Sequence, residues 1–550
     1  MHTIIPPDPR KTKIVIGIVA AFYVIIATFF IVGTWYQDYL QKLAAEADLR
    51  EKVLNTMQLQ MHQLEQQVRS KASEIISVAL NPSLVIAIPA VKKQFTDLHL
   101  TLNSELEHLV KTRSSADTES KAQYLHRDSS LLNNSILLLK STNELQHPFN
   151  RATLILAKHH AKSTQKRLFE HQHPANCASR KQLLCDINQK CGFGCQMHHV
   201  VGCLIAAIAL NRTLILYSSP WNYSKKGWGA YFEPVTNCTK SPEWKDNQIP
   251  VFTNVQSSHS FDIVKYPLVL SPDALPDWLP FGYPKYLAAD IPLFHGDPGL
   301  WWIAQNLKYL WRLRQNVSDI LSNQGILMRL QRPYVGIHIR RTDKILTETK
   351  AFAIFQYMEK VEAYFNRKNF NTENATGQRR RIFVATDDLS VIREIRAKYN
   401  YSYEIYGSDN AFLSKQNGMD PDDTPLMSII SDISFLAHSD HLVCTLSSNV
   451  CRMAYALMQV KEDKSGDFDS LDDQYWLPGA GQRPFKALYN HQRGNAHEME
   501  DMEKGDRLIA VENLWNGLSR ARNERTGHTG LIPSYKIAPV PLPVDISFPE

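Results

Sequence analysis

The sequence lacks a strong excess of charge of either sign. Its 550 residues contain 61 lysines and arginines against 55 aspartates and glutamates, which gives a net charge of +6. No run of basic residues forms the stripe that nucleic-acid-binding proteins use, so we expect no nucleic-acid partner. Because 44% of the residues are hydrophobic and only 21% are charged, most of the chain can bury cores, in two or three domains.

Long uncharged hydrophobic runs are also scarce, and the one that stands out lies near the amino terminus. Ile14 to Gly33 is an uncharged run of 20 residues, long enough to cross about 30 Å of hydrocarbon as a helix. Basic residues precede it and Trp35 follows it. A cleaved signal peptide is the alternative, but no convincing small-residue cleavage site precedes Trp35. We expect a cytoplasmic tail at residues 1–13 and an uncleaved signal-anchor at 14–35.

Cysteine is absent from the first 176 residues, and all eight cysteines lie beyond the expected anchor. An even number of cysteines in a non-cytosolic setting favours disulfides, although the sequence alone does not choose among the pairings. A zinc site is the alternative, because Cys191 and Cys195 are closely followed by His198 and His199.

Several Asn-x-Ser/Thr sequons accompany these cysteines, and we expect only some of them to carry glycans. They begin at Asn133, Asn211, Asn222, Asn237, Asn316, Asn374 and Asn400. Anchor, cysteines and sequons together predict a single-pass type II protein of the secretory pathway, with the region beyond the anchor in the lumen.

The polar segment after the anchor carries apolar residues at alternating spacings of three and four, which predicts a coiled coil within a helical stem at 36–170. The alternative is one amphipathic helix lying on the catalytic domain. We expect the stem to support a homodimer. The seam consists of Leu40, Leu43, Ala47, Arg50, Leu54, Met57, Met61, Leu64 and Val68, where Arg50 would weaken it. A second helical pattern runs through Phe95, Leu98, Leu102, Leu106 and Leu109.

From about residue 171, short apolar strands alternate with helices, which predicts α/β units around a mostly parallel sheet. We expect a first α/β lobe at 171–330 and a facing, Rossmann-like lobe at 331–492. Strand candidates are Thr213–Tyr217, Tyr334–Arg340, Arg381–Thr386 and His441–Leu446. Helix candidates are Ser390–Tyr399, Pro425–Ala437 and Asn449–Met458.

The tail at 493–550 has short strand patterns separated by Gly and Pro turns, which is similar to an SH3 β-barrel. Trp515, Pro533 and Tyr535 are residue types that build an aromatic groove for proline-rich peptides. A membrane-tethered SH3 adaptor would need this tail in the cytosol, which the cysteines and sequons oppose.

The richest chemistry lies in Val335–Glu348, which reads Val-Gly-Ile-His-Ile-Arg-Arg-Thr-Asp-Lys-Ile-Leu-Thr-Glu. Alternating apolar residues predict a strand that delivers Arg340 and Arg341 at its carboxyl end, where open α/β folds bind ligands. Adjacent guanidiniums suit a diphosphate. A basic strand end on a solvated surface is the alternative from these residues alone.

Five ordered blocks resemble the α1,6-fucosyltransferases that modify the core of N-glycans, over roughly residues 175–540. They are Cys191-Gly-Phe-Gly-Cys195-Gln-Met-His-His199, His295-Gly-Asp-Pro298 with Trp301-Trp302, His338-x-Arg340-Arg341-x-Asp343-Lys344 with Thr347-Glu348, Ala385-Thr-Asp-Asp388, and Leu442-Val-Cys-Thr-Leu-Ser-Ser448. The resemblance implies a GT-B-like two-lobed α/β region. It also implies transfer of L-fucose, with inversion, from GDP-fucose to the 6-hydroxyl of the innermost N-acetylglucosamine.

The resemblance implies catalytic roles for three residues. Arg340 would stabilise charge on the departing GDP, Glu348 would act as general base, and Lys344 would pair with Glu348 or relay its proton. The implied donor-binding residues are Arg340, Arg341, His338, Asp432, Ser448, Tyr223, Gly192 and Phe193. The implied acceptor-side residues are Asp387, Asp388, Asp297, Asp473 and Tyr357.

The resemblance further implies the disulfides Cys177–Cys238, Cys185–Cys203, Cys191–Cys195 and Cys444–Cys451. This chain departs from the family at three positions, with Leu514 in place of histidine, Asn449 in place of glutamine and Gln189 in place of lysine. The change at Leu514 puts acceptor contacts from the SH3-like module in doubt.

Metal-dependent glycosyltransferases bridge metal and diphosphate with paired carboxylates, and three pairs are candidates here: Asp387-Asp388, Asp420–Asp423 and Asp472-Asp473. Two arginines can replace a metal, and the family needs no divalent cation. We therefore expect no metal and no cofactor, with GDP-fucose as donor substrate.

The expected partners are N-glycosylated acceptor proteins, the Golgi membrane and a second copy of the chain, through the stem and the SH3 region. A protein O-fucosyltransferase is the nearest alternative enzyme, and the tail and stem disfavour it. A glycan-binding protein that has lost catalysis is the alternative of another class, and intact Arg340, Arg341 and Glu348 disfavour that.

Overall fold

The computed structural model describes residues 147–550 except 220, 241–244, 246–247, 253–259, 268–278, 280–281, 342–351, 371–379, 408–423, 461–466, 473–482, 492–500, 515–516, 541, 547 and 549–550. The expected anchor at 14–35 and the coiled-coil seam lie outside these residues. Within the described part of the chain, no helix is long and apolar enough to cross a membrane.

The first lobe is built on a three-stranded parallel sheet in the order β2-β1-β3. Its strands are β1 (Gln182–Asp186), β2 (Thr213–Tyr217) and β3 (Ile263–Lys265), and its longer helices are α5 (His147–Gln172), α6 (Phe193–Ala209), α9 (Pro298–Leu310) and α10 (Gln315–Met328). The apolar α6 is almost wholly buried, because it runs through the centre of the largest hydrophobic cluster. Shorter elements are η1 (Cys177–Ser179), η2 (Trp228–Ala230), β4 (Tyr283–Pro284), η4 (Lys285–Leu287) and α8 (Ile291–Phe294).

Helix α5 lies within the range predicted for the stem, yet it packs on the first lobe. Leu168 belongs to the lobe's hydrophobic cluster. The Gln165 side chain donates to the Gln305 carbonyl of α9 at 2.8 Å, and the Gln172 side chain accepts from the Leu214 amide of β2 at 2.9 Å. The first lobe therefore begins before the predicted boundary at 171, and the described part of 36–170 belongs to it.

The second lobe contains a five-stranded, all-parallel sheet in the order β7-β6-β5-β8-β9. Its strands are β5 (Val335–Ile339), β6 (Arg380–Thr386), β7 (Tyr403–Gly407), β8 (His441–Cys444) and β9 (Asp467–Ser470), and its helices are α11 (Ile354–Phe370), α12 (Leu389–Tyr399), α14 (Thr424–His438) and α15 (Asn449–Met458). The strand order reverses between β5 and β8, which is the order of a Rossmann-like half.

The two faces of this sheet carry separate hydrophobic clusters. Val335, Ile337 and Ile339 point toward α11 and α12, whereas α14 and α15 cover the opposite face with Leu436, Cys451 and Ala454. A Cβ on Gly336 would lie 2.9 Å from the Ser439 hydroxyl, so α14 approaches β5 closely only because this residue is glycine. The predicted α/β character of the chain is confirmed.

The tail forms a five-stranded sheet in the order β13-β12-β11-β10-β14 with antiparallel pairing. Its elements are β10 (Arg483–Ala487), β11 (Arg507–Asn513), β12 (Leu518–Asn523), β13 (Thr529–Pro533), η5 (Ser534–Lys536) and β14 (Ile537–Pro539). Strand β10 falls in the range predicted for the second lobe, so this sheet begins before the predicted boundary at 493. Trp515 and the Tyr535 side chain lie outside the described structure.

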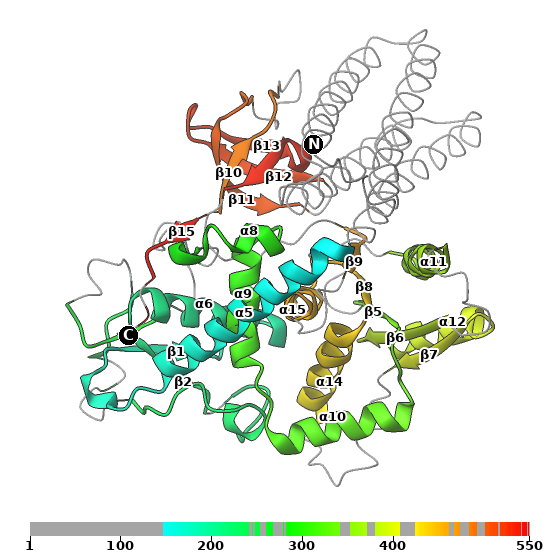
Figure 1. Ribbon diagram of the computed structural model, residues 1–550, viewed down its shortest axis with the longest axis horizontal. Coiled ribbons are helices and arrows are strands. Elements are labelled where there is room, and N and C mark those ends of the chain that lie inside the picture. Colours follow the sequence, from blue (N-terminus) through cyan, green and yellow to red (C-terminus); the bar gives the residue numbers. More distant parts are fainter. Residues whose placement is uncertain are drawn as a thin grey trace, which may run out of the picture.

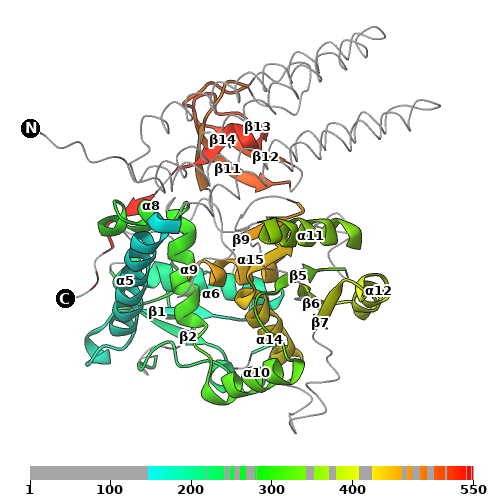
Figure 2. The same cartoon turned by 45° about the vertical axis from the view of Figure 1, so that its right-hand side comes forward.

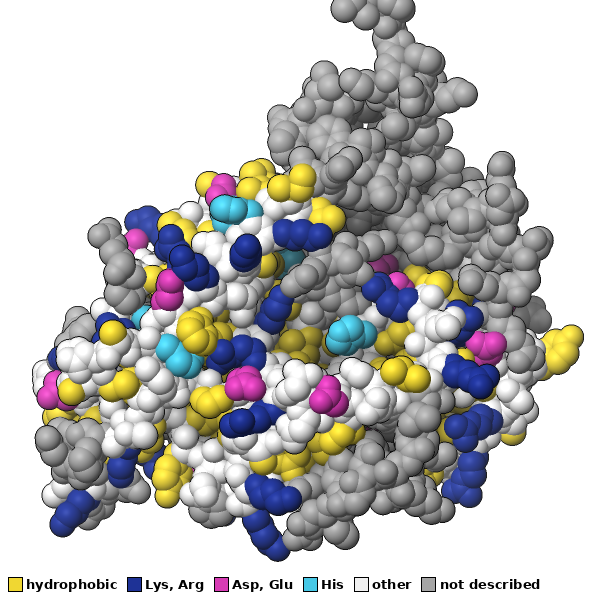
Figure 3. Space-filling view, turned by 60° about the horizontal axis from the view of Figure 1, so that its bottom comes forward, with side chains coloured by type: hydrophobic (Ala, Val, Ile, Leu, Met, Phe, Trp, Pro, Cys, Tyr) yellow, Lys and Arg dark blue, Asp and Glu magenta, His cyan; other side chains and the backbone are white. Residues whose placement is uncertain are grey.

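Figures 1 and 2 show the tail sheet on one side of the two lobes, near α8. After β14 the chain returns to the first lobe, where β15 (Pro543–Val544) pairs in parallel with β4. Figure 3 shows one face, on which Lys and Arg side chains are scattered among hydrophobic and neutral ones.

Candidate active site

The candidate site lies where β5 and β8 end, on either side of the point at which the strand order reverses. In open α/β sheets, ligands bind outside the carboxyl ends of the strands at such a point. Arg340 and Arg341 follow β5, and the Thr445–Ser448 turn follows β8 and leads into α15. The fold therefore brings the predicted arginines and the predicted phosphate-binding serine to one edge of the sheet.

Asp387, which follows the neighbouring strand β6, engages both arginines. Its carboxylate lies 3.2 Å from the Arg340 Nε and accepts from the Arg341 amide at 2.8 Å. The Arg341 side chain also donates to the Phe352 carbonyl at 3.3 Å. The resemblance assigns Asp387 to the acceptor side, and in the structure its contacts are to the arginine pair.

His338 lies inside β5, two residues before Arg340, and is buried. Burial and the positive charge of Arg340 lower the pKa of the His338 imidazole to about 4, against a smaller opposing effect of Asp387. The ring is therefore neutral near pH 7. Its Nδ1 has no hydrogen-bond partner among the described residues, and a buried polar atom of this kind is a natural contact for a polar ligand.

The turn before α15 is held by the buried carboxylate of Asp472. This group accepts from the amides of Leu446 at 2.7 Å and Ser447 at 3.1 Å, and from the Ser470 hydroxyl at 2.8 Å. Ser448 is the N-cap of α15, and its side chain makes no capping hydrogen bond. A helix N-terminus of this kind favours an anion such as phosphate.

The first lobe contributes a second helix N-terminus. Gly192 is the N-cap of α6, and the amide of Phe193 donates to the Tyr223 hydroxyl at 2.7 Å. The Cys191–Cys195 disulfide closes the loop at this end of the helix. The three predicted donor-site residues of the first lobe thus lie together.

The two helix N-termini meet. A Cβ built on Gly194 of α6 would lie 2.8 Å from the Cβ of Asn449, the first residue of α15. Gly192, Phe193 and Ser448, which are far apart in the sequence, are therefore brought close together by the fold.

Other predicted residues occupy structural positions. Asp297 caps α9 by accepting from the Leu300 amide at 3.0 Å, and Asp388 caps α12 by accepting from the Ser390 amide at 2.8 Å. Tyr357 is buried in the α11 side of the second-lobe core, where burial raises the pKa of its hydroxyl. Asp432 is half-buried in α14. Lys344, Glu348 and Asp473 lie outside the described residues.

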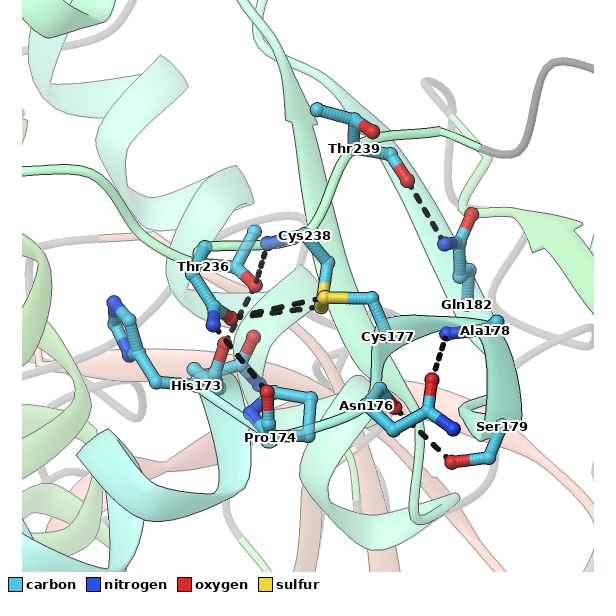
Figure 4. The surroundings of a disulfide bond; sticks show 12 residues. His173, Pro174, Asn176, Cys177, Ala178, Ser179, Gln182, Thr236, Cys238 and Thr239 are labelled. Carbon is cyan, nitrogen blue, oxygen red and sulfur yellow. Dashed lines mark hydrogen bonds between the residues drawn. A yellow bond between two sulfur atoms is a disulfide. The ribbon is translucent and has the colours of Figure 1, made fainter.

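All eight cysteines form disulfides, and the pairs are those that the resemblance implies: Cys177–Cys238, Cys185–Cys203, Cys191–Cys195 and Cys444–Cys451. Figure 4 shows Cys177–Cys238 joining η1 to the segment near Thr236, where the Thr236 hydroxyl donates to the Gln172 carbonyl at the end of α5. The zinc alternative for these cysteines is wrong. Cys185, His199 and Cys203 do gather within 4.8 Å, but the two sulfurs are bonded to each other.

The sequence analysis named Asp472 only within a candidate metal-binding pair and His198 only as a candidate zinc ligand. It assigned no site role to Asn449 or to Arg452, which donates to Asn449. The only signals were the adjacent Asp472-Asp473 pair and the departure at Asn449. Neither reveals a contact between residues that are hundreds of positions apart, such as Gly194 and Asn449.

Comparison with known proteins gives a family match. A model of the α1,6-fucosyltransferase N- and catalytic domains matches residues 32–476. The chain is 39% identical over 375 residues to an α1,6-fucosyltransferase of Drosophila melanogaster, covering 68% of this chain and 59% of the relative. It is 34% identical over 372 residues to one of Caenorhabditis elegans, covering 66% of this chain and 65% of the relative. The matched part thus spans less than two thirds of each relative.

Solved structures are less similar. A crystal structure of the NodZ α1,6-fucosyltransferase soaked with GDP-fucose is 14% identical, with a TM-score of 0.29, and covers 51% of this chain and 93% of that chain. A structure of POFUT1 in complex with GDP-fucose is 13% identical, with a TM-score of 0.31, and covers 52% and 97%. These scores are too low to carry structural conclusions. The family model and the two sequence relatives show that the chain belongs to the α1,6-fucosyltransferase family.

Proposed function

We propose that this protein transfers L-fucose from GDP-fucose to the 6-hydroxyl of the innermost, Asn-linked N-acetylglucosamine of N-glycans. The observation that carries the proposal is the convergence of Arg340, Arg341 and the α15 N-terminus at the reversal point of a parallel sheet. Family membership and the names of the relatives support the same reaction.

The donor would bind through its diphosphate and its guanine. Two guanidiniums and the N-termini of α6 and α15 are all suited to negative charge. The neutral, buried imidazole of His338 offers a polar contact for the guanosine part. Because Asp387 holds Arg340 and the Arg341 backbone before the donor arrives, little reorganisation is needed when charge develops on the leaving group.

The proposed reaction is a direct displacement. The acceptor 6-oxygen forms a bond to C1 of fucose, the bond from C1 to the β-phosphate oxygen breaks, and GDP leaves with that electron pair. Glu348 takes the proton from the 6-hydroxyl, and Lys344 pairs with Glu348 or passes the proton on. Attack from the opposite side converts the β-linked donor into an α1,6 product. Arginine stabilisation of GDP would allow the step to proceed without a metal.

The proposal extends to the setting of the enzyme. The chain would be a type II protein of the Golgi membrane, with residues 14–35 as anchor, a coiled-coil stem that supports a homodimer, a GT-B-like luminal region and an SH3-like tail. Its disulfides suit an oxidising compartment. Asp388, Asp297, Asp473 and Tyr357 would lie on the side of the acceptor.

The test is mass spectrometry of an N-glycopeptide incubated with the luminal part, GDP-fucose and EDTA. We expect a gain of one deoxyhexose on the innermost N-acetylglucosamine. Arg340→Ala should slow transfer by about 10²–10³-fold, the usual effect of removing a group aimed at developing charge, and Glu348→Gln should slow it at least as much. Arg507→Ala is the matched control, because this arginine pairs with Glu524 on the tail surface, in the tail sheet and outside both lobes.

Two outcomes would count against the proposal. Transfer that needs added divalent metal would refute the metal-independent mechanism. Folded protein that binds GDP but transfers nothing to the glycopeptide would favour another acceptor, such as a protein hydroxyl, or a binding role.

A further inference from the structure

Gly194 of the first lobe lies very close to Asn449 of the second lobe. A Cβ on Gly194 would lie 2.8 Å from the Asn449 Cβ, 2.9 Å from its carbonyl carbon and 3.1 Å from its carbonyl oxygen. Two of these distances are below 3.0 Å, and two of the three atoms belong to backbone, which cannot swing aside as the end of a flexible side chain does. Residue 194 therefore limits how near α6 and α15 can come.

Asn449 is held in place by Arg452 on its own helix, and His198 contacts the Gly194 carbonyl within α6. The Arg452 guanidinium donates to the Asn449 Oδ1 at 2.7 Å, and Arg452 is only 1% exposed. His198, which is also buried, has its Nδ1 2.7 Å from the Gly194 carbonyl; since a carbonyl only accepts, this nitrogen carries the proton.

The charge state of His198 suits this arrangement. Burial, followed by the positive charge of Arg452, lowers the pKa of the imidazole to about 3. The ring is therefore neutral near pH 7 and does not repel the buried guanidinium beside it. Gly194, His198, Asn449 and Arg452 form one compact group that links the two helix starts.

Helix α15 is fixed to the first lobe beyond this contact. Although α15 follows a strand of the second lobe, Met453 and Ala456 are buried in the hydrophobic cluster of the first lobe. The helix therefore cannot easily withdraw from α6 as a whole. A larger side chain at residue 194 would therefore displace the first turn of α15, next to Ser448.

We propose that Gly194 and Asn449 act as a spacer, which sets the distance between the two helix N-termini and thereby the affinity for the donor diphosphate. Gly194, Asn449 and Arg452 are positioning residues in this role, since they act through the groups that face the donor. The inference rests on the proposed function, because it assumes that GDP-fucose binds where the two N-termini meet.

The size of the expected effect follows from the geometry. To reach ordinary contact, at 3.4 Å or more, a side chain at residue 194 must move the α15 backbone by roughly half an ångström. Displacements of about 1 Å at a reacting site cost on the order of 10²-fold in rate. For a smaller displacement of helix starts that bind phosphate and do not react, we expect a loss of about tenfold in donor affinity.

The experiment measures GDP affinity by calorimetry, and kcat and KM for GDP-fucose, on the luminal protein. Gly194→Ala should raise the Kd for GDP and the KM for GDP-fucose by about tenfold, and change kcat at saturating donor by less than about threefold. Gly229→Ala is the matched control in the same lobe, because a Cβ there has no atom within 4 Å. Its constants should stay within about twofold of wild type.

A second variant keeps the test decisive if Gly194→Ala does not fold. Asn449→Ala keeps the Cβ contact but removes the acceptor for Arg452, and it should raise the Kd for GDP by about threefold or more. Unchanged GDP affinity in whichever of these variants folds would overturn the spacer role. Failure of the wild-type protein to bind GDP would instead refute the donor site itself, and the spacer role with it.

Discussion

At the scale of single residues, the contacts of Asp387 explain how two adjacent arginines can be held ready for a diphosphate. Side by side at a strand end, their positive charges would repel each other. One carboxylate lies 3.2 Å from the Arg340 side chain and accepts from the Arg341 backbone. Asp387 therefore leaves both guanidiniums positively charged and fixes the Arg340 side chain and the Arg341 backbone at the end of β5.

Asp387→Asn should raise the KM for GDP-fucose more than the KM for the glycan acceptor. The amide oxygen of asparagine can still accept from the Arg341 amide, but the charge opposite Arg340 is lost. We expect the KM for GDP-fucose to rise by about tenfold, in steady-state kinetics with both substrates varied. Glu394→Gln is the control, because this carboxylate pairs with Lys398 on the surface of α12. A rise in the acceptor KM alone would assign Asp387 to the acceptor instead.

At the scale of elements, the candidate site is formed where the ends of two strands and the starts of two helices come together. The end of β5, the turn after β8 and the first turns of α6 and α15 supply it. The turn after β8 has little regular structure of its own, and Asp472, at the end of β9, satisfies two of its amides. The shape of the phosphate-facing turn thus depends on a residue from a neighbouring strand.

Asp472→Ala should loosen this turn and destabilise the second lobe. The buried Ser447 amide would lose its acceptor, at a cost of about 1–3 kcal/mol, and the Leu446 amide would keep only its longer contact with the Ser470 hydroxyl at 3.3 Å. We expect a lower free energy of unfolding in urea, together with weaker GDP binding by the folded protein. Ser470→Ala removes one hydrogen bond to the same carboxylate and should cost only about 1 kcal/mol. Equal stability of Asp472→Ala and wild type would contradict the bracing role.

Much of the element pattern could be predicted from the sequence, because local periodicity determines it. The strand at Thr213–Tyr217 and the helix at Asn449–Met458 have the predicted bounds. At two places the elements extend across a predicted domain boundary, for physical reasons. A helix such as α5 has the same spacing of apolar residues whether it packs in a coiled coil or against a globular lobe. Strand β10, with Pro484 near its start, is short and has no clear alternation.

The candidate site was predictable only in part. The family motifs pointed to Arg340, Arg341, His338 and Ser448, which the fold brings to one edge. Contacts such as Gly194 with Asn449, or Asp387 with the arginine pair, depend on the packing of distant segments, which periodicity does not contain. For Glu348, Lys344 and Asp473, which lie outside the described residues, the assigned roles remain predictions.

At the scale of the whole molecule, buried histidines make stability depend on pH. Burial is the leading cause that lowers the pKa of His171, His198 and His491 to about 3 and that of His199 and His338 to about 4. These rings are neutral in the folded protein, whereas in the unfolded chain they take up protons near pH 6.5. Their stabilising effect is therefore complete above pH 6.5 and is lost as pH falls toward 4.

The urea midpoint should therefore fall steadily between pH 7 and 5. The slope for each such histidine grows as pH falls and approaches about 1.4 kcal/mol per pH unit well below pH 6.5. His171→Gln should flatten the slope by about one proton at the low-pH end of this range. Acidic groups such as Asp506, whose pKa is lowered to about 2 chiefly by Arg525, act only below pH 4. A midpoint that is constant from pH 7 to 5 would contradict this prediction.

The return of the chain to the first lobe after the tail sheet has a consequence for biosynthesis. Strand β15 pairs with β4, Ile546 is buried in the first-lobe cluster, and Phe548 packs against it. The ribosome makes these residues after both lobes and the tail sheet. The first lobe, although translated early, therefore cannot complete its core until residues 543–548 emerge, so its final maturation waits for nearly the whole chain.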